Sequence, residues 1–209
     1  MSGNLIVHRV FLNYHKHSAN TLFIDIYKAF RNGSDEYRMA SFSDEHMERL
    51  FEKFILEYYK EHHSYLNEIK AGQIKWNLEG DNEETMIKFL PVMQSDVMLR
   101  MGDRVLIIDA KYYEKSLRKY YDKHSLHSAN LYQIFSYVKN HDRDNSGQVS
   151  GLLLYAKTSE DIAPDASFNM GGNIIGARTL DLNVDFSQIS SQLDNIIKEF
   201  LINPIKERA

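Results

Sequence analysis

The chain has 209 residues, of which 43% are hydrophobic and 26% charged, and its formal net charge is −4. This is enough for one domain with a real core, whereas the negative balance argues against a dedicated DNA-binding protein with a basic surface. Cysteine is absent, which excludes disulfides and thiolate metal sites. No apolar run approaches the roughly 18 residues of a membrane span, and the N-terminus lacks the pattern of a signal peptide. We therefore expect a cytoplasmic protein with no membrane contact.

The first 42 residues are the hardest part of the sequence to interpret. Residues 5–12 fit a strand, and residues 20–30 fit a short helix that ends at the Asn-Gly-Ser-Asp sequence of 32–35. We treat residues 1–42 as a short N-terminal segment and residues 43–209 as the main domain.

Residues 43–63 form the clearest predicted helix. Apolar side chains recur there at the i, i+3, i+4 spacing over three turns. Ser43 is a suitable N-cap, and Asp44 and Glu45 occupy the positive first turn. Residues 73–79 then look like a strand, followed by a polar loop at 80–84.

The stretch from 91 to 111 predicts a hairpin. Residues 95–101 and 104–111 read as two strands around a Gly102-Asp103 turn, which is a strong hairpin signal. If Met101 faces Arg104, paired residue numbers sum to 205, and Asp96 lies opposite Asp109. Cross-strand Cβ atoms are roughly 4.5–5.5 Å apart, so two like charges would be held close together. Lys111, two residues beyond Asp109, emerges on the same face.

The remaining elements complete an α/β pattern. Residues 111–127 read as a basic loop, 128–140 as a helix that Ser128 caps, and 149–156 as a buried central strand. A long loop is expected over 157–172, a last strand over 173–182 and an amphipathic helix over 186–201. The order of elements predicts a mixed central sheet flanked by helices.

The hairpin residues match the PD-(D/E)xK pattern of nucleases, which reads here as Ser95-Asp96 and then Asp109-Ala110-Lys111. Carboxylate oxygens are the ligands that Mg²⁺ prefers. A bound Mg²⁺ would activate a water and neutralise the scissile phosphate, while Lys111 would position the attacking water or stabilise developing charge. The alternative is a surface hairpin on which Asp and Lys simply pair as neighbours.

Two further groups of residues bear on the same chemistry. The loop after the hairpin carries Lys115, Arg118, Lys119 and Lys123 among tyrosines and histidines, a combination that suits a nucleic-acid backbone but also a plain solvated loop. Gln133 and Tyr137 are four residues apart and share a helix face. They match the QxxxY pattern of exonuclease-type members of the superfamily, in which Gln133 would be catalytic and Tyr137 would contact DNA. A Tyr packed on the sheet with a Gln at the rim is the alternative.

Other chemistries find no support in the sequence. None of the nine histidines makes a convincing zinc set, and there is no Gly-rich phosphate loop for ATP or GTP. A glutamate of the first helix could be an additional metal ligand. On a helical wheel Glu48 flanks the apolar face, and Glu52 falls nearly opposite it, so periodicity prefers Glu48.

Several ordered blocks of the sequence resemble the McrC family, the nuclease subunit of the McrBC 5-methylcytosine-specific restriction system. These blocks are MERLFEKFILEYYKE, IKW, FLPVMQSDVMLRMGDRVLIIDAKYY, LHSANLYQIFSYVKN and SGLLLYA. They cover residues 43–156 well and the remainder loosely. The resemblance implies a restriction-endonuclease-like PD-(D/E)xK core with Asp96, Asp109 and Lys111 as catalytic residues, and it prefers Glu52 over Glu48 as the additional metal ligand.

The same resemblance implies partners. McrC-type subunits cut DNA with Mg²⁺ as cofactor and work with McrB, a GTP-dependent AAA+ subunit that recognises methylated DNA. Family members usually carry a longer N-terminal region that engages the GTPase, so residues 1–42 read as its remnant. We expect a metal-dependent endonuclease that cuts within such a complex. A non-catalytic assembly or decoy subunit and a stand-alone exonuclease are the alternatives.

Overall fold

A computed structural model describes residues 44–80, 87–112, 117–120, 123–157, 163–182 and 184–203. The strand expected at 5–12, the helix expected at 20–30 and the whole N-terminal segment lie outside the described residues. The expected division into a 1–42 segment and a 43–209 domain therefore stays a prediction.

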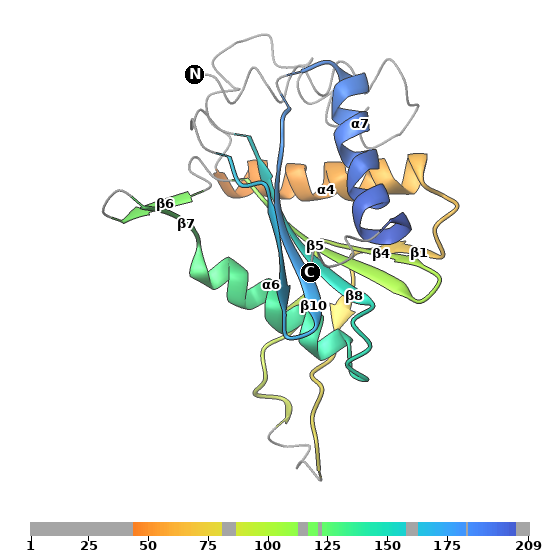
Figure 1. Cartoon of the computed structure of the whole chain (residues 1–209), viewed down its shortest axis with the longest axis vertical. Coiled ribbons are helices and arrows are strands. Elements are labelled where there is room, and N and C mark those ends of the chain that lie inside the picture. Colours follow the sequence, from red (N-terminus) through yellow and green to blue (C-terminus); the bar gives the residue numbers. More distant parts are fainter. Residues whose placement is uncertain are drawn as a thin grey trace.

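A six-stranded mixed sheet forms the centre of the molecule (Figure 1). Its strand order is β1-β4-β5-β8-β10-β9. β5 and β10 run parallel to β8, whereas the pairs β1–β4, β4–β5 and β9–β10 are antiparallel. The strands are β1 (Glu68–Lys70), β4 (Val97–Met101), β5 (Arg104–Lys111), β8 (Val149–Ala156), β9 (Ala166–Met170) and β10 (Asn173–Leu180). The predicted mixed sheet is confirmed.

Helices cover both faces of this sheet (Figure 1). α4 (Asp44–His62) and α7 (Phe186–Ile197) pack on one face, and α7 continues as a π-helical turn, η1 (Lys198–Ile202). α6 (Ser128–His141) packs on the other face. None of the described helices is long and apolar enough to cross a membrane.

The alternation along β5 assigns its side chains to two separate cores. Leu106, Ile108 and Ala110 join the cluster under α4 and α7, whereas Val105 and Ile107 join the cluster under α6. Because successive side chains of a strand point to opposite faces, Asp109 and Lys111 continue the second series. The acid and the lysine of the D-x-K sequence therefore belong to the α6 face.

Two glycines let the helices approach the sheet closely. A Cβ at Gly151 would lie 2.7 Å from Cγ1 of Ile134 and 2.8 Å from Cγ2 of Val138, both on α6. A Cβ at Gly176 would lie 2.7 Å from the ring of Phe200. Each glycine is thus required where a helix presses on a central strand, β8 for α6 and β10 for η1.

Most predicted elements are confirmed, but the chain from 68 to 94 differs from expectation. The strand expected over 73–79 is reduced to β2 (Gln73–Ile74), which pairs with β3 (Met93–Gln94) in a separate two-stranded sheet. Beyond Ile74 the chain leaves the sheet, because Trp76 Nε1 donates to the Pro91 carbonyl at 2.8 Å and Asn77 N donates to Asn140 Oδ1 at 2.8 Å. Residues 75–80 and 87–92 form an arm that extends away from the body (Figure 1). The short strand β1 was missed.

Three further expectations are corrected. The long loop expected over 157–172 contains β9, which gains its order from pairing with β10. Part of the basic loop forms a second hairpin, β6 (Leu117–Tyr120) and β7 (Lys123–Leu126). Ser128 is not the cap of α6, since the N-cap position is His127 and makes no side-chain cap hydrogen bond.

Candidate active site

The β4–β5 hairpin has the predicted register. Val97 pairs with Ile108 and Met101 with Arg104, so paired numbers sum to 205. Gly102 has a φ of +60°, the left-handed conformation that a two-residue hairpin asks of its first central residue. β4 begins at Val97 rather than Ser95. Asp96 lies one residue before the strand, and the same register extended by that residue places it beside Asp109.

Asp96 is fixed where the chain enters β4. Its Oδ2 accepts a hydrogen bond of 2.7 Å from the backbone N–H of Ala110 on β5. Burial, followed by the negative charges of Asp109 and Glu52, raises the pKa of Asp96 from 3.8 to about 7, against the opposing effects of the Ala110 N–H and Lys111. The fold thus holds this carboxyl at an energetic cost when it is ionised.

The backbone next to Asp96 is held by Ser95, which forms hydrogen bonds with Gly72. The buried Ser95 hydroxyl donates to the Gly72 carbonyl at 3.1 Å and accepts from the Gly72 N–H at 3.2 Å, while the Ser95 N–H donates to the same carbonyl at 2.9 Å. The serine that precedes Asp96 therefore connects β3 to the β1–β2 connection. This contact limits the movement of the backbone next to the carboxylate.

Asp109 and Lys111 form a buried ion pair. Asp109 is 1% exposed and Lys111 8% exposed, and Lys111 Nζ lies 3.0 Å from Asp109 Oδ2. The contact is not aligned as a hydrogen bond, and Oδ2 accepts no hydrogen bond from the described residues. Burial raises the pKa of Asp109, and the ammonium group of Lys111 opposes this rise. The two side chains are buried rather than on the surface, although Asp109 and Lys111 do pair as neighbours, as the alternative expected.

Glu52 brings a third carboxyl group from α4. Burial raises its pKa first, the charge of Glu48 second, and Lys111 and Asp109 also act on it. Glu52 is only partly exposed, although the helical wheel puts it nearly opposite the apolar face. Glu48 is also partly exposed, and its charge acts on Asp109 as well. The charges of both glutamates influence the hairpin carboxylates. The charge of Glu52 raises the pKa of Asp96, and the charge of Asp109 raises the pKa of Glu52. The charge of Glu48 raises the pKa of Asp109.

These residues fit a divalent cation that needs few protein ligands. Asp109 Oδ2 is buried and lies against the Lys111 ammonium, and a cation would further relieve the mutual repulsion of Asp96 and Asp109. Within the described part of the chain, no three Asp, Glu or His side chains form a complete metal cage. Mg²⁺ is bound through one or two carboxylates and keeps several waters, so the donor set suits Mg²⁺ better than a structural metal.

Gln133 and Tyr137 are brought together on α6. Gln133 Nε2 donates to the Tyr137 hydroxyl at 2.8 Å. Tyr137 is buried in the cluster under α6, and Gln133 is partly exposed at its margin. The pair therefore shares one face as expected, with the Tyr ring packed and the Gln amide at the rim.

The expected DNA-contacting cations lie on or beside the second hairpin. Lys115 falls outside the described residues. The backbones of Arg118 and Lys119 belong to β6, and that of Lys123 to β7. This hairpin projects beside the N-terminal end of α6 (Figure 1), one short connection after the end of β5.

One buried polar contact of α6 was not expected from the sequence. Asn130, on the first turn of α6, is 6% exposed and donates from Nδ2 to the Tyr155 hydroxyl at 3.3 Å. Tyr155 is the Cα partner of Lys111 across β5 and β8. The available signal was the spacing of Asn130 from Ile134 and Tyr137, which places an amide in the buried row of the helix.

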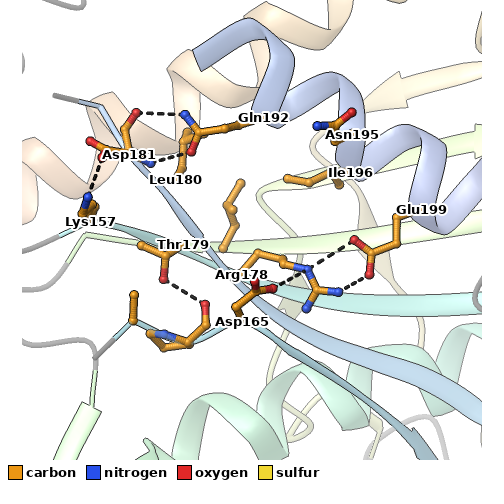
Figure 2. Close-up of a pocket in the computed structure, with 13 residues that line it drawn as sticks. Lys157, Asp165, Arg178, Thr179, Leu180, Asp181, Gln192, Asn195, Ile196 and Glu199 are labelled. Atoms are coloured by element: carbon orange, nitrogen blue, oxygen red, sulfur yellow. Dashed lines mark hydrogen bonds and ion pairs between the residues drawn. The ribbon is translucent and has the colours of Figure 1, made fainter. Parts of the chain in front are cut away.

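A cavity of about 460 Å³ lies elsewhere, between the ends of β8 and β10 and the helix α7 (Figure 2). Arg178 pairs there with Glu199 and with Asp165, and Lys157 Nζ lies 2.6 Å from Asp181 Oδ2. Gln192 also bonds the backbone of Asp181. The two cations are engaged by three carboxylates, so the cavity presents no net positive charge to a phosphate. We conclude that the ion pairs and hydrogen bonds around this cavity stabilise the packing of α7 and η1 on β10. The cavity lies apart from the hairpin carboxylates.

Fold and site define a class: an α/β protein with a restriction-endonuclease-like core and an acidic hairpin at the end of a central strand. The family model described as "McrBC 5-methylcytosine restriction system component" matches residues 4–156, and the chain belongs to this family. The chain is also similar to the "Type IV methyl-directed restriction enzyme EcoKMcrBC" of Escherichia coli (strain K12), with 28% identity over 167 residues, 79% of this chain and 47% of the relative. The chain thus spans about half the length of that relative. The resemblance to the McrC family is confirmed.

Proposed function

We propose that this chain is a Mg²⁺-dependent DNA endonuclease, the cleavage subunit of a GTP-dependent restriction complex that acts on modified cytosine. The observation that supports it most is the group at the end of the hairpin, formed by the buried Asp109 and Lys111 and the partly buried Asp96. Two neighbouring acids withdrawn from water are costly for stability, so a chemical role explains why the fold holds them.

Asp96 and Asp109 would hold the cation, and Glu52 from α4 would join them only by moving closer, because no three such side chains of the described residues form a metal site as they stand. When bound, Mg²⁺ supplies an activated water and neutralises charge on the phosphodiester. Lys111 already lies against Asp109, and its ammonium group would orient the attacking water and stabilise the developing negative charge. Gln133, whose amide is held by Tyr137, would bind a substrate oxygen at the edge of the site.

DNA would follow the projecting hairpin to the carboxylates. Lys115, Arg118, Lys119 and Lys123 would contact phosphates, which attract cations without regard to sequence. No element of the described chain is expected to read a modified base, so the choice of target would come from a partner. An McrB-like AAA+ GTPase is the partner that we propose.

The test is cleavage of methylated plasmid with Mg²⁺, with and without the cognate GTPase. We expect nicking by the wild type and a loss of at least about 100-fold for Asp109→Asn, which removes one carboxylate ligand. Asp103→Asn, at the exposed turn of the same hairpin, is the matched control and should cut normally. Equal cutting by wild type and Asp109→Asn would refute the proposal.

The contact between Gln133 and Tyr137 favours a second candidate, a stand-alone exonuclease. That activity would degrade linear DNA from its ends and leave closed circles intact without any GTPase. A non-catalytic assembly or decoy subunit is distinguished by calorimetry, because it would give no Mg²⁺ binding heat that depends on Asp96 and Asp109.

A further inference from the structure

We propose that Asn130 is a positioning residue that holds Lys111 in place through Tyr155. This inference deepens the proposed function, because Lys111 is the cation of the proposed site. Asn130 and Tyr155 lie on different elements, α6 and β8, and neither belongs to the D-x-K or QxxxY sequence. Their contact is the 3.3 Å hydrogen bond from Asn130 Nδ2 to the Tyr155 hydroxyl.

The register of the parallel strands brings Tyr155 beside Lys111. The two residues are Cα partners across β5 and β8, and side chains of paired residues emerge on the same face of a sheet. Tyr155 belongs to the cluster under α6, the face to which Asp109 and Lys111 also belong. The phenol ring and the lysine stem thus start from adjacent backbone positions on the same face, and the lysine is 8% exposed.

The hydrogen bond then fixes the ring. Tyr155 is fully buried, and a buried hydroxyl needs a partner to offset its desolvation. Asn130 supplies one from the first turn of α6, whose position on β8 is set by the close approach at Gly151. Leucine and phenylalanine at these two positions would avoid the cost of burying polar groups, so the polar pair indicates a need for a defined ring orientation.

Asn130 also links the two predicted parts of the site. It precedes Gln133 by three residues, so the amides lie on one edge of α6. Each amide donates to a tyrosine hydroxyl, Asn130 to Tyr155 and Gln133 to Tyr137. The two hydrogen bonds therefore fix side chains next to both parts of the proposed site, the end of β5 and the exposed edge of α6.

The test measures Lys111 directly. An amine-acylating reagent is applied to the full chain, and the rates at Lys111 and at the half-exposed Lys157 are read by peptide mass spectrometry; Lys157 is the internal reference. We expect Asn130→Ala and Tyr155→Phe each to raise the ratio of Lys111 to Lys157 labelling about fivefold, the factor that corresponds to one hydrogen bond of about 1 kcal/mol. The Asn130→Asp variant should keep the wild-type ratio, since the Tyr155 phenol can donate a hydrogen bond to a carboxylate at position 130.

Asn140→Ala is the matched control, because Asn140 is an amide of the same helix that bonds Ser136 and the arm instead. It should leave Lys111 labelling unchanged. In a cleavage assay Asn130→Ala should lower kcat about fivefold with KM unchanged, as expected for a misplaced transition-state group. Folded Asn130→Ala and Tyr155→Phe proteins with wild-type Lys111 labelling would overturn the inference. Increased labelling in a chain that never cuts DNA would support the positioning role and refute the proposed nuclease.

Discussion

Replacement of Asp96 by Asn should stabilise the metal-free protein, and the gain should depend on pH. The pKa of Asp96 is raised from 3.8 to about 7 in the folded state. For a group with a raised folded pKa, stability is fully present below the unfolded pKa and is lost as the pH rises through the folded pKa. The wild type should therefore lose stability from pH 4 to 7, whereas an Asn side chain titrates nowhere in this range and can still accept the Ala110 N–H.

The magnitude follows from the width of the shift. Each pH unit between the two pKa values changes the free energy of unfolding by about 1.4 kcal/mol. From pH 5 to pH 8 about two of these units are crossed, so the advantage of Asp96→Asn over wild type should grow by at most about 3 kcal/mol. For a chain of this length that corresponds to a difference in Tm of about 6–12 °C.

The assay is thermal unfolding of both proteins in EDTA at pH 5 and pH 8, with Asp103→Asn as the control from the same hairpin. A repeat in Mg²⁺ at pH 8 should stabilise the wild type more than Asp96→Asn, because a ligand that binds the folded state stabilises it by mass action. An identical pH dependence of Tm for wild type and Asp96→Asn would refute the idea that repulsion and burial act on this carboxyl.

Three other outcomes are expected. Lys111→Met should reduce DNA cleavage by about 100- to 1,000-fold, as loss of a charge-stabilising donor does; wild-type turnover would contradict its role. Gly151→Ala should cost about 1–3 kcal/mol in urea unfolding through overpacking against α6, and an unchanged midpoint would show that α6 can shift freely. Asp142→Ala should cost about 3 kcal/mol because the buried carboxylate accepts hydrogen bonds from Ser146, Gly147 and Asn173, with acid unfolding at a higher pH than wild type as the second measurement.

The sequence predicts the hairpin and its register because two local rules agree there. A Gly-Asp turn fixes which residues face each other, and the apolar run from Val105 to Ile108 places β5 in the centre of the sheet. Counting one residue beyond the first pair, Val97 and Ile108, places Asp96 at the level of Asp109, and its carboxylate accepts the N–H of the next residue, Ala110. Local rules also predict β8 and α6, where a continuous apolar run and a helical period dominate the pattern.

The two strands that sequence reasoning missed differ in how far away their partners are. β9 pairs with the adjacent β10 across the Gly171-Gly172 turn, a two-residue hairpin signal, whereas β1 is three residues long and pairs with the more distant β4. The contact between Asn130 and Tyr155 joins positions 25 residues apart. The helical period places Asn130 in the buried row of α6, but its partner Tyr155 is decided only when α6 packs on β8.

Asp96 is joined to the arm by a very short stretch of backbone. The arm returns to the body through β3, and Asp96 follows β3 by two residues. Both sides of the arm's base are tied together by Ser95 and Gly72, so the backbone next to this carboxylate is anchored where the arm leaves the body. Phe89 and Val92, 76% and 71% exposed, lie on the arm side of this tie. Two strongly exposed apolar side chains and the Asp96 carboxylate are therefore joined by one short, hydrogen-bonded stretch of backbone.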